Sequence, residues 1–317
     1  MMQGKEYPFD EEAKRLYDAQ PPHYPQAYFD SLLAAIGQEL PGSGSVSERW
    51  LAYRSGFAIP KEKLDTVFKT AIAEARRRTK AHYALPAEEN FRVEYVTGKP
   101  WSGYNYYQGG GYSLIQLNTD HAIYIERAVD LACHEGYPGH HVFNVLLEEE
   151  LVNRRGWMEY SIYPLFSPQS LIAEGSANYG IEVAFPDAER LAFEKEVLFP
   201  LAGLNPAEAE RYYSILQKIA HLNFAGNEAA RLYLNGSLSR QQTADWLVTY
   251  TFYDPGKALQ RTEFIDRYRS YVINYNLGQE LVSRWVERQG GTAQDPQRRW
   301  DVFRELLSNP YSASMLQ

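Results

Sequence analysis

The segment HEGYPGHH at residues 134–141 decides how this sequence is interpreted. It begins like the zinc-binding pattern His-Glu-x-x-His, in which two histidines one helical turn apart bind the metal and the glutamate acts on a water molecule. Pro138 occupies the place of the second histidine, so His140 or His141 would have to reach the metal by a different backbone route. The segment therefore predicts a metal site on an interrupted helix.

The residues before this segment predict the helix that carries it. Apolar side chains recur at helical spacing at positions 122, 125, 129 and 132, and Thr119 or Asp120 is the expected N-cap. His134 and Glu135 then lie near the end of the helix. In a straight helix, His140 and His141 would lie about 9 and 10.5 Å along the axis from His134, too far to share one zinc ion with it.

Pro138 and its neighbours supply a way to shorten that path. Proline has no N–H to donate to the carbonyl of His134, it disfavours helical geometry at the preceding residue, and the glycines on either side relax the backbone. We therefore expect a local loop-out. If two residues are looped out, His140 becomes the second ligand, and if three are, His141 does; His140 is the first choice.

A candidate third ligand lies in LIAEGSANYGIEVAF, residues 171–185. Small residues at 173, 177, 180 and 184 form a helix face that allows close approach of another helix, and Glu174, Asn178 and Glu182 recur beside it every four residues. Glu174 is the expected ligand because Gly175 and Ser176 crowd it least. Asn178 or Glu182 is expected to orient a ligating imidazole.

Composition limits the class of protein. The chain has 317 residues, 44% of them hydrophobic, which is enough for a sizeable core, and its net charge of −8 argues against a nucleic-acid partner. Its single cysteine, Cys133, excludes an intramolecular disulfide and is interpreted as a small buried hydrophobic residue. An acidic start without an apolar run predicts no signal peptide and a cytoplasmic location, and no stretch predicts a membrane span.

The order of patterns predicts a mainly α protein of the α+β class. PGSGSVSE, residues 41–48, is the expected joint between an N-terminal arm, residues 1–47, and one helical domain, residues 48–317. A helix is expected over 61–83, and most of the chain after residue 120 has helical periodicity. FRVEYV, YNYY and YSLIQL between residues 91 and 117 predict one small antiparallel sheet beside the motif helix, with YSLIQLN as an edge strand to which an extended peptide could pair.

HEGYPGHH followed by EGSANYGIE resembles the bacterial family catalogued as domain of unknown function 885, whose members are regarded as gluzincin-like zinc metallopeptidases with an EGxAxYxxE motif. The resemblance extends from about Thr66 to the C terminus and includes GYSLIQLNTD and YRSYVINYNLG. Ser176 stands where a tryptophan is expected, and the chain is short for the family. The resemblance implies a gluzincin-like helical body in which zinc is bound by His134, His140 or His141, and Glu174, with Glu135 as general base.

Oxyanion stabilisation needs a donor besides the metal. Tyr271 and Tyr275 lie one turn apart ahead of Gly278, where we expect a helix to end, and Arg267 or Arg269 is the expected partner of a substrate carboxylate. The expected activity is hydrolysis of a peptide or small amide. The alternatives are hydrolysis of a non-peptide amide or ester, or a zinc-binding protein without activity.

Overall fold

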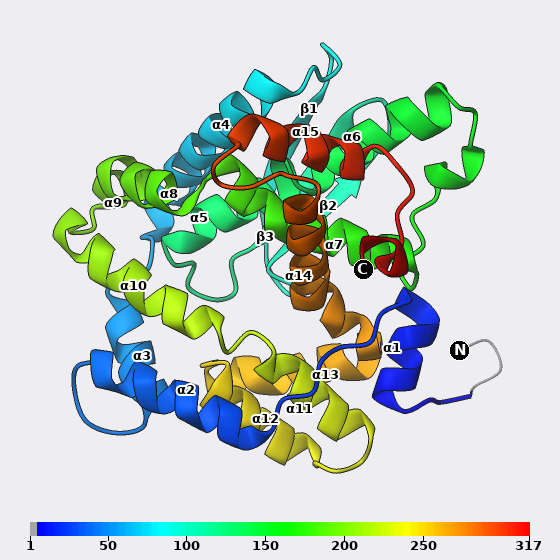
Figure 1. The fold of residues 1–317 in the computed structure, drawn as a ribbon. Coiled ribbons are helices and arrows are strands. Elements are labelled where there is room, and N and C mark those ends of the chain that lie inside the picture. Colours follow the sequence, from blue (N-terminus) through cyan, green and yellow to red (C-terminus); the bar gives the residue numbers. More distant parts are fainter. Residues whose placement is uncertain (1–4, 100) are drawn as a thin grey trace.

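A computed structural model describes residues 5–99 and 101–317 and shows a mainly helical protein with one small sheet (Figure 1). The α-helices are α1 (Phe9–Tyr17), α2 (Gln26–Glu39), α3 (Val46–Ser55), α4 (Leu64–His82), α5 (Glu126–Leu131), α6 (His140–Leu147), α7 (Pro168–Ala184), α8 (Asp187–Phe193), α9 (Phe199–Ala202), α10 (Ala209–Ala220), α11 (Ala225–Leu234), α12 (Arg240–Tyr250), α13 (Pro255–Tyr268), α14 (Ile273–Arg288) and α15 (Pro296–Leu307). This confirms the predicted fold class.

Shorter helical turns join several of these helices. Those of π type are Ala132–Gly136, Glu148–Asn153 and Glu194–Leu198, and those of 3-10 type are Lys61–Lys63, Met158–Ser161, Pro206–Glu208, Arg269–Val272 and Ala313–Leu316. Within residues 5–99 and 101–317, no helix is both long and apolar enough to cross a bilayer.

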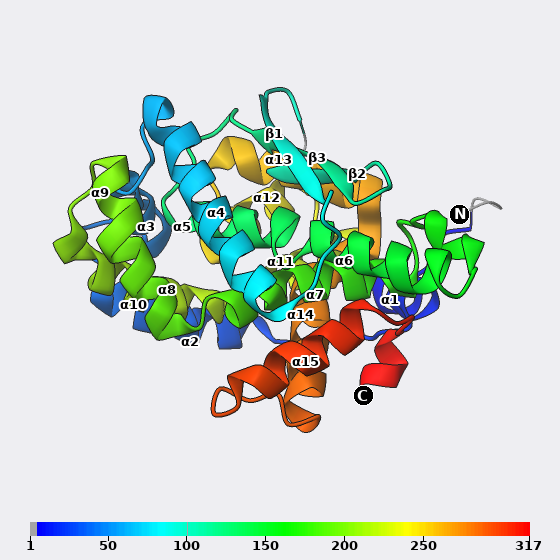
Figure 2. The same cartoon turned by 90° about the horizontal axis from the view of Figure 1, so that it is seen from above.

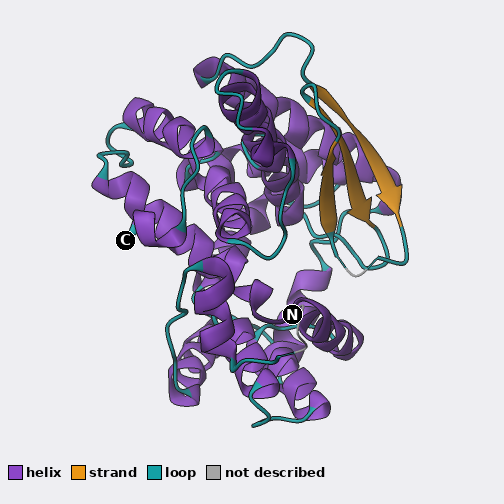
Figure 3. Cartoon of the chain, turned by 90° about the vertical axis from the view of Figure 1, so that its right-hand side faces the viewer, coloured by secondary structure: helices purple, strands orange, loops and turns teal. Residues whose placement is uncertain are grey.

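The three strands lie at one edge of the helical body (Figure 3). They are β1 (Asn90–Val96), β2 (Gly103–Tyr107) and β3 (Tyr112–Asn118), in the order β1-β3-β2. β3 pairs parallel to β1 and antiparallel to β2, so the sheet is mixed and the predicted antiparallel sheet is wrong in that respect. β3 (YSLIQLN) is central, so the prediction of an edge strand is also wrong: β1 and β2 occupy its two sides.

Helix α4 shows why the periodicity at 61–83 was informative. Its buried residues recur every three or four positions, from Leu64 through Phe68, Ala71 and Ala75 to Thr79, and none of its charged residues is buried. In Figure 2, α4 runs along one side of the sheet and the motif helices. Helix α4 therefore packs against the helical segment that carries the predicted site.

The motif helix begins later than expected. α5 starts at Glu126, so neither Thr119 nor Asp120 is its N-cap. The reason is a short extended pairing: Ile59 donates to the carbonyl of Ile123 and Ile125 to that of Phe57. Those backbone contacts hold residues 123–125 out of the helix.

Helices α7 and α14 cross in the middle of the molecule at two glycines (Figure 1). A Cβ on Gly175 would lie 2.3 Å from the carbonyl carbon of Gly278, and a Cβ on Gly278 would lie 2.6 Å from the carbonyl oxygen of Leu171. Gly278 is inside α14 and does not end it, so the expected helix end there is wrong; the glycine is needed for close packing. The close approach uses Gly175 rather than the predicted face at 173, 177, 180 and 184.

The N-terminal segment packs onto the same body. Phe9 and Tyr17 of α1 are fully buried, and Glu12 forms an ion pair with Arg269 at 2.6 Å. The predicted division of the chain at residue 47 stays a prediction.

Candidate metal centre

The backbone of residues 132–140 makes the predicted detour. After α5 the chain continues as the π-helical turn Ala132–Gly136, the Tyr137–Pro138 peptide bond is cis, and α6 begins at His140. The amide of Gly139 donates to the carbonyl of Cys133 at 2.9 Å, six residues back instead of the four of an α-helix. Two residues are thus looped out, as expected for the route that brings His140 to the site.

The detour brings three potential ligand atoms together. His134 Nε2 lies 3.2 Å and His140 Nε2 3.6 Å from Glu174 Oε2, and one ligand atom from each residue lies within 4.8 Å of the others. Donors bound to one tetrahedral zinc ion at about 2.0–2.1 Å would be about 3.3–3.4 Å apart. Within the described residues, the buried Oε2 of Glu174 has no hydrogen-bond partner. The three residues therefore form a possible metal-binding group whose dimensions suit zinc.

Asn178 orients one of the imidazoles. Its Oδ1 lies 2.9 Å from Nδ1 of His134, and its Nδ2 donates to the carbonyl of Tyr275 at 2.8 Å. Because the amide nitrogen is already used as a donor, the oxygen faces the imidazole and accepts from Nδ1–H. This leaves the lone pair of His134 Nε2 directed at Glu174, as a metal ligand requires.

Glu174 is held from two sides. Its Oε1 accepts a hydrogen bond from the hydroxyl of Tyr271 at 2.7 Å, and Oε2 faces the histidines. Burial alone would raise the pKa of the Glu174 carboxyl, but the neighbouring imidazoles of His140 and His134 hold it well below its usual range. Glu174 is thus an ionised, fixed carboxylate, which is the form that binds a cation.

Glu135 lies beside this group on the π-helical turn. Its side chain is 4% exposed, and burial raises the pKa of its carboxyl. Its backbone carbonyl accepts from Asn105 Nδ2 at 2.7 Å, and a Cβ on Gly103 would lie 2.6 Å from its Oε1. Strand β2 therefore packs directly on Glu135, and Gly103 leaves the room that its carboxylate occupies.

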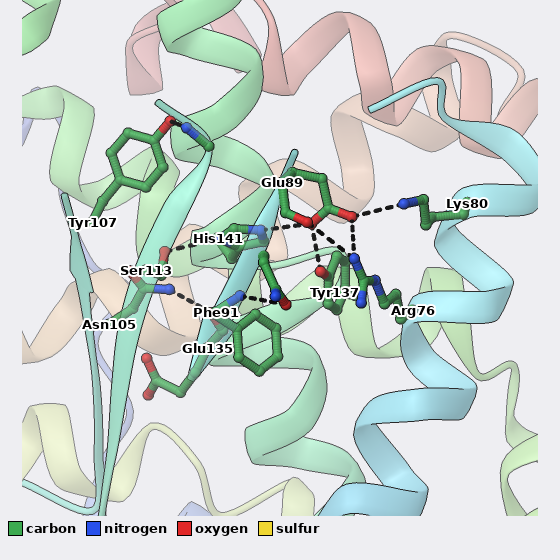
Figure 4. A network of polar contacts seen from close by, with 12 residues as sticks. Arg76, Lys80, Glu89, Phe91, Asn105, Tyr107, Ser113, Glu135, Tyr137 and His141 are labelled. Carbon is green, nitrogen blue, oxygen red and sulfur yellow. Dashed lines mark hydrogen bonds and ion pairs between the residues drawn. The ribbon is translucent and has the colours of Figure 1, made fainter. Parts of the chain in front are cut away.

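His141 points away from the metal-binding group, into a second polar network shown in Figure 4. Its Nε2 lies 3.0 Å from Glu89 Oε2 and its Nδ1 2.8 Å from Ser113 Oγ, so the alternate choice of His141 as ligand is not supported by the geometry. The same carboxylate accepts from the hydroxyl of Tyr137 at 2.5 Å. Glu89 thus fixes the side chains of two residues of the motif, Tyr137 and His141.

Glu89 is fully buried and is neutralised by cations on α4. Arg76 and Lys80 each approach its Oε1 at 2.8 Å. Burial opposes ionisation, but the contacts with His141, Lys80, Tyr137 and Arg76 hold the pKa of Glu89 well below its usual range. Neither Glu89 nor Asn105 was singled out in the sequence, where no spacing links either residue to the motif.

Of the other predicted residues, the two tyrosines lie at the metal-binding group and Glu182 has a different partner. The ring of Tyr275 lies 6.5 Å from that of His134, centroid to centroid, and 5.8 Å from that of Tyr271, so both tyrosines are at the site. Glu182 accepts instead from Gln279 at 2.6 Å and does not orient a ligating imidazole.

The two predicted arginines have other contacts in the structure. Arg269 pairs with Glu12, and its φ of 51° breaks the helix there, while the exposed Arg267 lies over the ring of Tyr268 at 5.5 Å. The pattern TEFIDRYRSYVINYN suggested one continuous helix, but α13 ends at Tyr268 and the 3-10 turn Arg269–Val272 separates it from α14. Arg269 is therefore already paired with an acidic side chain of the protein, and the prediction that Arg267 binds a substrate carboxylate stays a prediction.

Comparisons with known proteins define the fold but not the activity. No family model and no curated protein matches the chain. A solved structure described as "the putative lipoprotein from Colwellia psychrerythraea" is similar with a TM-score of 0.69 at 16% sequence identity, over 97% of this chain and 53% of that one. The chain thus spans about half the length of that protein, and the likeness is one of fold.

Proposed function

We propose that the protein is a zinc-dependent hydrolase that cleaves peptide bonds, related to the family catalogued as domain of unknown function 885. The observation that carries the proposal is the convergence of His134, His140 and Glu174 beside the buried Glu135. Three protein ligands leave a fourth position for water, as in catalytic zinc sites. A purely structural zinc site would have a fourth protein ligand and no need of an adjacent acid.

Each residue has a role that follows from its position. A bound zinc ion would polarise the scissile carbonyl and lower the pKa of a water molecule toward about 7. Glu135 accepts the proton of that water and returns it to the leaving amine, and its raised pKa makes it a stronger base than an exposed carboxylate. Asn178 keeps His134 in the tautomer that binds a cation.

Tyr271 and Tyr275 have different proposed roles. Tyr271 donates to Glu174 and fixes the orientation of that ligand. Tyr275 packs against His134 and is the donor we assign to the oxyanion of the tetrahedral intermediate. Tyr275→Phe should therefore lower kcat with little change in zinc content, whereas Tyr271→Phe should weaken zinc binding.

The substrate is expected to lie along β2. This strand pairs with β3 on one side, and its other edge pairs with no strand of the described chain. Because β2 packs on Glu135 through Gly103, a peptide added to that edge would pass close to the general base. The edge strand proposed to pair with a peptide is thus β2 and not β3 (YSLIQLN).

The proposal is tested by zinc content and hydrolysis together. Glu135→Gln should keep one equivalent of zinc and lose hydrolysis of a mixed peptide library, because it removes the base and preserves the shape. Glu174→Gln should lose zinc, while Glu182→Gln, two turns along the same helix but bonded to Gln279, is the matched control and should change neither. Undiminished turnover by Glu135→Gln would assign the base elsewhere, and zinc retained by Glu174→Gln would remove the site. Cleavage of amides or esters but not of peptides would support the non-peptide alternative.

A further inference from the structure

A groove lies between α4 and β1, an edge strand of the sheet. Its volume is about 690 Å³, within the range of about 300–1,000 Å³ that is typical of small-molecule sites. Two contacts between its walls mark its length: Arg76 approaches Glu89 at 2.8 Å, and the hydroxyl of Tyr95 approaches Asp65 at 3.4 Å. Because Asp65 and Arg76 are eleven residues apart on α4, the groove runs for at least about 16 Å. A ligand that fills it is therefore elongated.

Much of the lining of this groove is apolar, although the groove is open to solvent. The apolar lining residues are Phe68, Ile72 and Ala73 of α4 and Phe91 and Val93 of β1. All except Phe68 are at least partly exposed. The backbone groups of α4 are hydrogen-bonded within the helix, so this wall offers none to a peptide. An alkyl chain leaves no polar group unpaired on such a surface, whereas the backbone of a peptide would.

Most of the charged side chains around the groove have an oppositely charged partner in the protein. The charged lining residues are Asp65, Lys69, Arg76, Arg77, Lys80 and Arg92. Lys69 pairs with Asp65 at 2.7 Å, Arg77 with Glu74 at 2.7 Å, and Arg92 with Glu94 at 2.8 Å. Glu74 also pairs with Arg78, which has a second partner in Glu189. These positions therefore leave no excess of positive charge.

Arg76 and Lys80 differ because they share one carboxylate. Both approach Oε1 of Glu89 at 2.8 Å, while Oε2 accepts from Tyr137 and contacts His141 (Figure 4). Glu88, the neighbouring acid in the sequence, is exposed and does not line the groove. The side chains of Arg76 and Lys80 are 36% and 38% exposed, so both can contact a second anion. This end of the groove thus has two cations for one acidic side chain.

We propose that the groove binds an amphiphile with a single carboxylate, such as a fatty acid. Its head group contacts Arg76 and Lys80 through charge-assisted hydrogen bonds, and its alkyl chain lies along the apolar lining toward Tyr95. The single excess cation matches a single head group, and the length and apolar lining match one alkyl chain. The site is separate from the metal-binding group and does not rest on the proposed function.

The first test measures binding to the full chain by calorimetry, with octanoate, decanoate, dodecanoate and 1-decanol as probes. We expect one equivalent of the acid to bind, with an affinity that rises about fourfold for each added methylene until the groove is filled. Decanoate should bind about 10- to 100-fold more tightly than 1-decanol, the range expected for hydrogen bonds to a charged group. Equal affinity for decanoate and 1-decanol, or no binding of any acid, would overturn the site.

A pair of substitutions on α4 tests the apolar part of the groove. Ala73 is exposed and lines the groove, so Ala73→Phe should fold normally and obstruct the alkyl chain, with loss of most of the decanoate affinity. Ala81→Phe is the matched control, because Ala81 is an exposed residue of the same helix that does not line the groove. Equal decanoate affinity in the two variants would show that the acid binds elsewhere.

A second pair tests the position of the head group. Lys80→Met leaves Arg76 to neutralise Glu89 and should weaken decanoate binding about 10-fold. Lys69→Met changes a cation near the other end of the groove, one already paired with Asp65, and should alter the affinity by less than about twofold. A larger loss in Lys69→Met than in Lys80→Met would overturn the assignment of the head group. A pentapeptide of alternating glutamate and valine that binds more tightly than dodecanoate would overturn the proposal in favour of a peptide site.

Discussion

Replacing Gly139 by alanine is the sharpest test of how the backbone builds the site. Gly139 is the residue just before α6, and its amide closes the loop-out by donating to Cys133. An alanine Cβ there would lie 2.1 Å from the carbonyl oxygen of His134 and 2.3 Å from that of Cys133. Both clashes are with backbone, so no side-chain rotation relieves them.

The size of the effect follows from these distances. To bring a Cβ from 2.1 Å to a contact of at least 3.0 Å, α6 and the π-helical turn must separate by about 0.9 Å. Metal–ligand distances tolerate about 0.2 Å. His134 lies on one side of this separation and His140 on the other, so one histidine is lost as a ligand. We expect zinc affinity to fall about 100-fold, or about 2.8 kcal/mol.

The assay is competition for zinc against a chelator of known affinity, with circular dichroism to follow helix content. Gly226→Ala is the control, because Gly226 is also helical and its Cβ would meet nothing within 4 Å. That variant should bind zinc like the wild type. If Gly139→Ala is folded and binds zinc within about threefold of the wild type, then the loop-out does not set the distance between the two histidines.

Three further changes test other parts of the site and its support. Gly103→Ala would place a Cβ 2.6 Å from Glu135 Oε1, so the Glu135 side chain must move. The rate of hydrolysis should fall about tenfold at unchanged zinc content. A kcat equal to that of the wild type would show that the position of this carboxylate does not depend on Gly103. Glu89→Gln removes the anion that holds His141, and urea unfolding should show a loss of about 3 kcal/mol, where an unchanged midpoint would refute the network's role. Burial raises the pKa of Glu194 to about 8. In the folded protein Glu194 therefore keeps a proton that it loses in the unfolded chain above about pH 4.5. The free energy of unfolding should then fall from pH 5 to pH 8 by up to about 1.4 kcal/mol per pH unit. In Glu194→Gln that dependence should flatten, and a slope equal to that of the wild type would contradict the assignment.

The sequence was informative wherever a local pattern determined the geometry. The helix over 61–83, the two-residue loop-out at Pro138 and the grouping of His134, His140 and Glu174 all follow from spacing within one segment or from the chemistry of the residues. Each is a case in which a residue type admits few backbone conformations or few partners.

Contacts between distant segments could not be predicted in the same way. The start of α5 depends on backbone pairing with residues 57–59, and the order of the strands depends on where the chain crosses after β1. Glu89 acts on His141 from 52 residues away in sequence. Gly278 looked like a helix end because its packing partner, Gly175, lies on another helix. Spacing within one segment carries no information on such pairs.

The crossing of α7 and α14 at Gly175 and Gly278 also limits how this protein can be re-engineered or can diverge. Glu174 on α7 and Tyr275 on α14 are kept together by two backbones in van der Waals contact, with no side chain between them to act as an adjustable spacer. Any larger residue at either glycine moves the two helices apart in one step. New substrate preferences should therefore arise from mutations in β2, where side chains can be exchanged singly, while the two glycines of the crossing must be kept together.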